Sequence, residues 1–220
     1  MGNQLTSNYV PAAGFSFLTR FYDPLVRITC RETYFKQRMI ELAHPAQGEK
    51  ILDVGCGTGT LLLQMQAYQD NLELHGLDGD ARVLKIAQQK AGRSSSEISF
   101  KQAYSTNIPY PDNHFDLITN SLMIHHLNPE DKIRTFREMH RVLKPDGRLI
   151  LADWGEPQND LMRLGSLGIR LIDGFDNLKA HIQGDIPEMV YEVGFLPVNV
   201  MEYVPTVFGT LSLIRANKAL

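Results

Sequence analysis

Three glycines at alternate positions, directly after a short apolar run, could hold a small ligand against bare backbone. Gly55, Gly57 and Gly59 follow the run 51–54, whose apolar character suits a buried central strand. Because glycine lacks a Cβ and tolerates a positive φ, a ligand can lie directly against such a turn. Apolar residues at helical spacing then predict a helix over 60–68, whose first N–H groups point back at the turn. This arrangement suits a ligand that carries a carboxylate or a phosphate.

The spacing of the glycines separates two classes of ligand. A dinucleotide fingerprint has glycines at the first, third and sixth positions of the turn. Here the sixth position is Thr60, the third glycine falls one place early at Gly59, and Asp53 stands two residues before the turn. The spacing therefore disfavours a nicotinamide-dependent dehydrogenase, which stays an alternative, and a plain strand–helix connection is another.

An acidic residue ends the next apolar run. Asp78 comes about 20 residues after Gly57, a position from which an acid accepts hydrogen bonds from ribose hydroxyls. Charge-assisted bonds of this kind contribute roughly 1.5–3 kcal/mol each. The alternative is that Asp78 caps the helix predicted over 81–91, but Asp80 is at least as good a cap. We therefore expect Asp78 to bind ribose.

The elements that must position these residues alternate between strand and helix, as in a parallel sheet covered on both faces. The sequence predicts strands at 50–54, 72–77, 98–100, 115–118 and 149–151. It predicts helices over 15–44 with breaks, 60–68, 81–91, and from Asn128 to Lys144. Two alternating runs, around 198–202 and after Pro205, predict an antiparallel hairpin at one sheet edge.

Length and composition limit the class of protein. With 220 residues, 43% hydrophobic and 9% aromatic, the chain suits one large α/β domain, or one domain with a lid. The net charge is −3 and no basic block occurs, which argues against a nucleic-acid partner. No apolar run approaches the roughly 18 residues of a membrane span, and the N-terminus lacks the pattern of a signal peptide.

The cysteines and histidines indicate neither a disulfide framework nor a metal site. Cys30 and Cys56 are too few for a framework and fit a reducing compartment, so we predict a cytoplasmic location. The seven histidines include no pair at metal-ligand spacing with cysteine partners. We therefore predict no metal.

Four segments of the chain carry these features in one order: ILDVGCGTGT, GLDGD, IPYPDNHFDLITNSLMIHHL and FREMHRVLKPDGRLILAD. Together they resemble class I S-adenosylmethionine (SAM) methyltransferases of the ubiquinone/menaquinone-biosynthesis type, and so do the early Phe21-Tyr22-Asp23 and the tail TVFGTLSLIRA. The resemblance covers nearly the whole chain. It implies an α/β fold with a seven-stranded, mostly parallel, Rossmann-like sheet, helices on both faces and a C-terminal antiparallel hairpin. It also implies one domain over 1–220, with an N-terminal helical cap over 1–45 and a helical lid over 155–193.

The resemblance implies SAM as the cofactor and S-adenosylhomocysteine (SAH) as its product. Carried onto this sequence, the expected cofactor-binding residues are Asp53, Gly55, Cys56, Gly57, Thr58, Gly59, Asp78, Gly79, Ala103, Tyr104, Asn120 and Ser121. Asn120 and Ser121 would line the methionine end of the cofactor.

One position departs from the family pattern. The family usually has an acidic residue after the third strand, where it binds the adenine amino group, and this chain has Ala103 there. The loss of one such bond weakens binding by roughly 1–3 kcal/mol. We hypothesise that Tyr104 compensates, by stacking on the adenine or through its backbone N–H.

Methyl transfer from a sulfonium depends mainly on orientation, which is worth about 7–11 kcal/mol, while a general base adds about two to four powers of ten. Candidate bases follow the fourth and fifth strands, and one lies near the N-terminus: His125, His126, Asp153 and Tyr22. The alternative for the two histidines is that one packs in the core and the other caps a helix or faces solvent.

The segment 155–193 has apolar residues at helical spacing and predicts either a lid or an ordinary covering helix. A lid would enclose an apolar pocket, so we expect a small, partly hydrophobic acceptor. The expected partners are this acceptor and, as an option, a second copy of the chain in a homodimer. A non-catalytic SAM-binding module is the alternative function, and the residue at position 103 keeps it open.

Overall fold

The computed structural model describes residues 31–94, 97–160, 162–164 and 175–219 of the chain. Tyr22, Cys30 and most of the expected N-terminal cap lie outside the described residues. Among the described residues, no helix is long and apolar enough to cross a membrane. The division into cap, domain and lid remains a prediction.

The elements follow one another in the predicted alternation. The strands are β1 (Lys50–Val54), β2 (Glu73–Asp78), β3 (Ile98–Gln102), β4 (Phe115–Ser121), β5 (Leu143–Trp154), β6 (Phe195–Thr206) and β7 (Gly209–Lys218). The helices are α2 (Glu32–Ala43), α3 (Thr60–Tyr68), α4 (Ala81–Arg93), α5 (Pro129–Val142), α7 (Phe175–Gln183) and α8 (Ile186–Glu192), with a short 3₁₀ turn, η1 (Ile124–His126).

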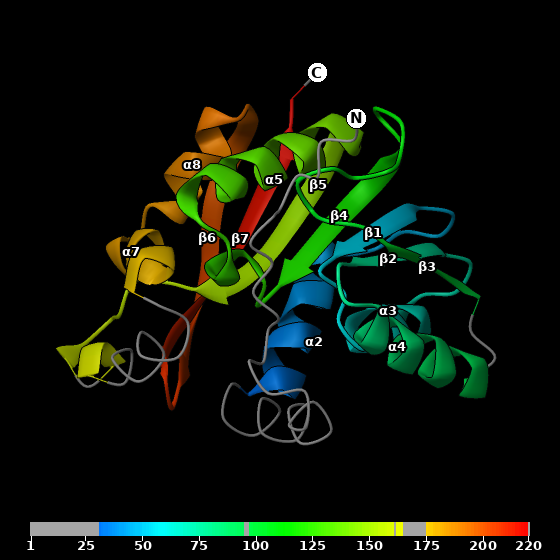
Figure 1. Ribbon diagram of the computed structural model, residues 1–220, viewed down its shortest axis with the longest axis horizontal. Coiled ribbons are helices and arrows are strands. Elements are labelled where there is room, and N and C mark those ends of the chain that lie inside the picture. Colours follow the sequence, from blue (N-terminus) through cyan, green and yellow to red (C-terminus); the bar gives the residue numbers. More distant parts are fainter. Residues whose placement is uncertain (1–30, 95–96, 161, 165–174, 220) are drawn as a thin grey trace, which may run out of the picture.

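One sheet organises the molecule (Figure 1). Its seven strands have the order β3-β2-β1-β4-β5-β7-β6. The pairs from β3 to β5 are parallel, and β7 runs antiparallel to both β5 and β6. The predicted mostly parallel sheet with a terminal hairpin at its edge is therefore confirmed.

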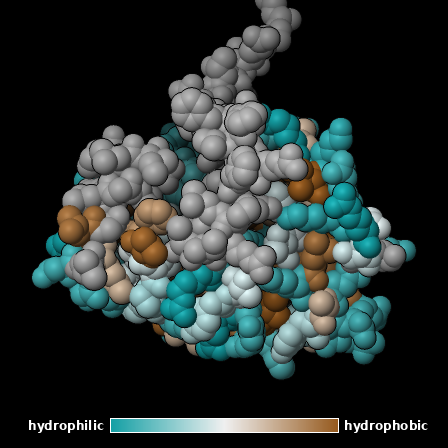
Figure 2. All heavy atoms as spheres, turned by 90° about the horizontal axis from the view of Figure 1, so that it is seen from below, coloured by the Kyte–Doolittle hydropathy of each residue, from teal (hydrophilic) through white to brown (hydrophobic). Residues whose placement is uncertain are grey.

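Two apolar layers hold helices on opposite faces of the sheet. One cluster joins α2, α3 and α4 to the side chains of one face, such as Ile51 and Leu117. The other joins α5 and α8 to the opposite face, through residues such as Leu52 and Phe136. Figure 2 views the molecule from the end at which the parallel strands finish, and there the hydrophobic side chains that are coloured stand in small separate groups. The large apolar surfaces are thus buried between sheet and helices.

The predicted boundary between α5 and β5 is wrong, since β5 was expected over 149–151 and begins at Leu143. The helix that begins at Asn128 was expected to reach Lys144, but it ends at Val142, and Leu143 already pairs with Phe115 across the sheet. A Cβ at Gly147 would lie 2.7 Å from Leu143 Cγ, so the glycine lets the chain pack closely where β5 begins. At Leu143 and Lys144, strand formation therefore outweighs the helical pattern of the sequence.

Candidate active site

The turn after β1 is fixed to the end of β2 by backbone hydrogen bonds. The N–H groups of Gly55 and Cys56 both donate to the carbonyl of Leu77, at 2.7 and 3.0 Å. The three glycines have φ values of 72°, 52° and 74°, which residues with a side chain rarely adopt. On the other side of the turn, Lys90 of α4 donates to the hydroxyl of Thr58 at 2.7 Å. Hydrogen bonds therefore hold the turn on both sides.

The glycines of the turn serve different purposes. A Cβ at Gly55 would lie 2.7 Å from Met123 Cγ, and a Cβ at Gly59 would lie 3.2 Å from Ala87 and Phe100. A Cβ at Gly57 would meet nothing within 4 Å. Gly55 and Gly59 are thus required by packing, whereas Gly57 borders open space in which a ligand can lie.

Asp78 closes β2 beside this open space. Its Oδ2 accepts a hydrogen bond from the N–H of Gly57 and its Oδ1 accepts one from the N–H of Asp80, both at 2.9 Å. Burial raises the pKa of Asp78, while the backbone N–H groups of Asp80, Gly57 and Gly79 act in the opposite direction. Asp80 caps α4 by accepting from the N–H of Arg82 at 2.8 Å, so the capping role falls to Asp80. A carboxylate has about four acceptor sites, so Asp78 can still accept from a ligand.

Asp53 and Asn120 lie under the turn on the neighbouring strands. Thr119 donates its hydroxyl to Asp53 at 2.8 Å, and burial raises the pKa of Asp53 to about 7. Asn120 donates to the carbonyl of Val54 at 2.6 Å, but its Oδ1 is buried and has no hydrogen-bond partner among the described residues. A buried acceptor without a partner costs free energy, so it marks a place where a ligand donor fits. Ser121, the next residue, ends β4 and is half-buried.

A hollow lies beyond Asp78, where the adenine was expected. It is lined by Gly79, Lys101, Gln102, Ala103, Tyr104, Asn107 and Pro109. Ala103 donates its N–H to the carbonyl of Asp78 at 3.1 Å, and the side chain of Tyr104 is 50% exposed. The fold therefore brings Gly79, Ala103 and Tyr104 together at one hollow, and their contact with the cofactor stays a prediction. Lys101, Gln102, Asn107 and Pro109 were missed, since their side chains carry no motif.

Two of the candidate bases form a buried pair. His125 of η1 and Asp153 of β5 are 4% and 2% exposed, and Nδ1 of His125 lies 2.6 Å from Oδ1 of Asp153. The carboxylate also accepts from the N–H of His125 at 3.2 Å and from that of Trp154 at 2.7 Å. Burial alone would raise the pKa of Asp153, but His125 and His181 hold it well below its ordinary value. Because a carboxylate only accepts, the Nδ1 of His125 carries the proton.

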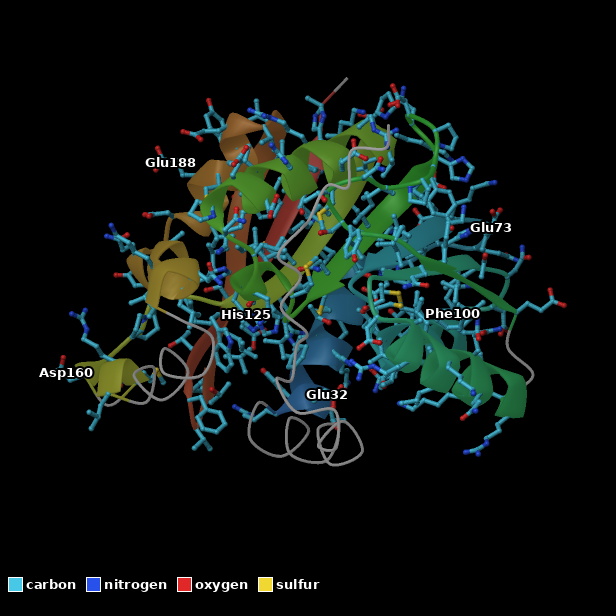
Figure 3. The ribbon with its side chains drawn as sticks, viewed as in Figure 1. Glu32, Glu73, Phe100, His125, Asp160 and Glu188 are labelled. Carbon is cyan, nitrogen blue, oxygen red and sulfur yellow. The ribbon has the colours of Figure 1, made fainter. Side chains whose placement is uncertain are left out.

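His126 and Tyr22 differ from this pair. The ring of His126 lies 3.9 Å from that of His125, measured between centroids. Tyr22 lies outside the described residues. Figure 3 shows His125 near the ends of the central strands, with Phe100 on the side of α3 and α4.

Two buried polar residues beside this pair were not predicted from the sequence. His181 of α7 contacts the carbonyl of Trp154 through Nδ1 at 2.8 Å, and burial lowers its pKa to about 4. Lys132 of α5 is 0% exposed. Neither lies in a recognisable motif, and a lysine on a polar helix is expected to face solvent, so only the fold reveals them.

Burial raises the pKa of the Cys56 thiol well above its ordinary value, so it stays protonated within the turn. Among the described residues, no group of three or more histidine, cysteine or acidic side chains is placed to hold a metal ion.

The sheet order, the antiparallel β7 and the glycine turn after β1 define a Rossmann-like methyltransferase fold. A SAM-dependent methyltransferase from Aquifex aeolicus has this fold, with a TM-score of 0.67 at 18% identity over 90% of this chain and 96% of that one. So does a phosphoethanolamine N-methyltransferase 2 of Haemonchus contortus solved with SAM, with a TM-score of 0.67 at 17% identity over 85% of this chain and 53% of that one.

Sequence comparison narrows the class. The family described as "Methyltransferase domain" matches residues 51–147. The ubiquinone/menaquinone biosynthesis C-methyltransferase UbiE of Shewanella oneidensis is 30% identical over 206 residues, which cover 84% of this chain and 80% of that protein. The chain belongs to the class I SAM-dependent methyltransferases, in the branch that contains these C-methyltransferases. It is an enzyme with SAM as its cofactor, and the dehydrogenase and non-catalytic alternatives are set aside.

Proposed function

We propose that the enzyme transfers the methyl group of SAM to a small, partly hydrophobic acceptor at the ends of β4 and β5. The observation that carries the proposal is the open space at Gly57 beside the carboxylate of Asp78. The His125–Asp153 pair lies at the same edge of the sheet. Met123 connects the two places, since it packs at Gly55 and stands two residues before His125.

The residues around the turn fit the parts of the cofactor. Asp78 has spare lone pairs for the ribose hydroxyls, and the unpartnered Oδ1 of Asn120 can accept from the ammonium of the methionine moiety. The hollow at Ala103 and Tyr104 takes the adenine. Asp53 supplies negative charge beneath a cofactor that carries a sulfonium and an ammonium.

The chemistry requires orientation first and proton removal second. Bound SAM supplies an electrophilic methyl group and leaves as neutral SAH. The acceptor gives up a proton when its new bond to the methyl carbon forms. His125 carries its own proton on Nδ1, which faces Asp153, so Nε2 is the atom that accepts the proton of the acceptor. Asp153 then stabilises the resulting imidazolium.

The acceptor is proposed on two grounds. The relatives are named ubiquinone/menaquinone biosynthesis C-methyltransferases, which supports a quinone-related acceptor for this chain. The segment 155–193 supplies α7, which stands against η1 and β5, and α8, which packs on β6 and α5. The cytoplasmic location, the homodimer and the lack of a nucleic-acid partner remain predictions.

Calorimetry of the purified chain with SAH tests the cofactor site directly. Binding near micromolar, or about 8 kcal/mol, is expected. Radiolabel from methyl-tritiated SAM should then appear in an apolar small molecule when the enzyme is incubated with a cell extract. A folded protein that gives no heat with SAM or SAH would overturn the proposed site, and label confined to protein or nucleic acid would overturn the proposed acceptor.

A further inference from the structure

Lys132 is fully buried on a helix that otherwise presents many charged residues to solvent. Its Nζ donates to the carbonyl of Leu127 at 2.7 Å and to the carbonyl of Asn177 at 2.5 Å. Leu127 directly follows η1, the turn that carries His125 and His126, and Asn177 belongs to α7. One ammonium group therefore joins the turn of the candidate base to a helix from the expected lid.

Two further bonds attach α7 in the same place. The side chain of Asn177 donates to the carbonyl of His126 at 3.3 Å, and His181 contacts the carbonyl of Trp154 at 2.8 Å. The rings of His181 and His125 lie nearly perpendicular, with centroids 6.3 Å apart. Helix α7 is thus fastened to both elements that carry the His125–Asp153 pair, and it stands beside that pair.

The cost of burying Lys132 indicates that its charge has a purpose. Moving an ammonium out of water costs several kcal/mol, and two carbonyl groups and a nearby carboxylate offset only part of this. Burial lowers the pKa of Lys132 to about 8, while Asp153 acts in the opposite direction. A leucine or methionine would fill the same space without that cost, so stability alone does not account for a lysine here. A charged group that demands acceptors in fixed positions specifies one arrangement of the segments around it.

We propose that Lys132 is a positioning residue: it fixes α7 against the turn of His125 and thereby keeps the His125 imidazole dry and bonded to Asp153. The proposal rests on the proposed function for the role of that pair in proton transfer, but the arrangement itself can be measured without an acceptor. If α7 separates from η1, water reaches the pair and competes for the bond between His125 and Asp153.

The test is Lys132→Met in the full chain, which keeps the length of the side chain and removes the charge and both donated bonds. Two readouts report on the pair itself: the downfield proton resonance of the His125 Nδ1–H, and the rate at which diethyl pyrocarbonate modifies His125 and His181. We expect the resonance to broaden or disappear and modification to become about tenfold faster, as for a locally opened segment. The affinity for SAH should stay within about twofold.

A matched control removes a lysine that has an ion pair elsewhere. Lys144 at the start of β5 donates to Asp116 at 2.7 Å, and neither residue touches the pair. Lys144→Met should leave the resonance and the modification rates unchanged. With a known acceptor, Lys132→Met should lower kcat and leave KM nearly unchanged, because the pair acts on the proton rather than on binding.

The outcomes separate positioning from simple support of the fold. If Lys132→Met only lowers the melting temperature while the resonance and the protection of His125 persist, Lys132 does not position the pair and the proposal is wrong. If that variant does not fold, Lys132→Gln decides, because its uncharged side chain is one bond shorter than that of lysine but can still donate hydrogen bonds. It should change the same two readouts in the same direction by a smaller amount, and no change would overturn the proposal. Failure of the wild type to bind SAH would instead count against the proposed function, since neither readout depends on the cofactor.

Discussion

The N–H of Gly57, in the turn after β1, donates a hydrogen bond of 2.9 Å to the carboxylate of Asp78, the last residue of β2. The bond ties the turn after β1 to the last residue of β2. The second carboxylate oxygen accepts from the N–H of Asp80 at the same distance. One side chain thus shapes the turn and faces the space proposed for ribose, so a change at Asp78 should affect both.

Asp78→Asn should weaken SAH binding about 10- to 100-fold and lower the free energy of unfolding by about 1–2 kcal/mol. An amide has only one acceptor oxygen, so its NH₂ group must face the N–H of either Gly57 or Asp80. Calorimetry and urea unfolding measure the two effects. Asp80→Asn is the matched control, because asparagine caps a helix about as well as aspartate. Equal SAH affinity for Asp78→Asn and the wild type would remove Asp78 from the cofactor site.

Replacing Gly55 or Gly57 by alanine should distinguish a glycine required for packing from a glycine required for ligand binding. Gly55→Ala places a Cβ against Met123 and also strains a φ of 72°, so it should destabilise the fold by more than Gly57→Ala. Gly57→Ala strains the backbone by about 1–2 kcal/mol but meets no protein atom. We expect Gly57→Ala to fold and to lose most SAH affinity, because its methyl group enters the space of the ligand. If this variant binds SAH normally, the ligand does not lie against Gly57.

Asp53 should make both stability and cofactor binding depend on pH. Its pKa of about 7 lies above the ordinary value of 3.8, so the folded chain takes up a proton that the unfolded chain has lost. The stabilisation is fully present below about pH 4 and is lost as the pH rises through 7. Thr119, Lys36, Asp78 and Cys56 are the neighbours that influence this carboxyl group.

A cationic cofactor favours the ionised form of Asp53, so SAM binding at pH 7 should release part of a proton. The measured heat should then differ between phosphate and Tris buffers, which differ in their enthalpy of ionisation. Asp53→Asn should abolish this difference and flatten the dependence of stability on pH between 4 and 7. A buffer-dependent heat that survives in Asp53→Asn would assign the proton to another group.

The features that sequence reasoning predicted are those encoded by neighbouring residues. The glycine turn, the cap at Asp80 and the start of α5 at Asn128 each depend on a few consecutive side chains, and the structure confirms these elements. The role of Asp78 towards ribose remains a prediction. The end of α5 was predicted wrongly, because Leu143 pairs with β4 and that pairing lies outside the local pattern.

The contacts of the His125–Asp153 pair could not be predicted in the same way. His125 and Asp153 were candidates because each follows a strand, but their bond depends on how η1 folds back over β5. No pattern in the sequence indicated that Lys132 and His181 are buried beside the pair. Their burial results from the packing of α7 against η1, and Lys132 and Asn177 are 45 residues apart in the sequence.

Ala103→Asp should strengthen SAH binding about tenfold. Ala103 lies at the hollow next to Asp78, and a carboxylate there can accept a bond from the adenine amino group, worth roughly 1–3 kcal/mol. Ala103→Asn tests whether charge is needed, since it offers a neutral acceptor of similar size. Calorimetry with SAH and with adenosine measures the gain. Unchanged affinity in Ala103→Asp would mean that the adenine lies elsewhere, or that position 103 does not correspond to the acidic position of the family.

Asp153→Asn should reduce methyl transfer about 10²- to 10⁴-fold while SAH affinity stays within about threefold. The carboxylate forces the proton of His125 onto Nδ1, and an amide that donates to Nδ1 would force it onto Nε2, where the base is needed. The amide also has one oxygen for the N–H groups of His125 and Trp154, so the melting temperature should fall by several degrees. Single-turnover transfer from methyl-tritiated SAM separates the chemical step from binding. Methyl transfer at the wild-type rate in folded Asp153→Asn would show that orientation alone drives the reaction and that the His125–Asp153 pair removes no proton.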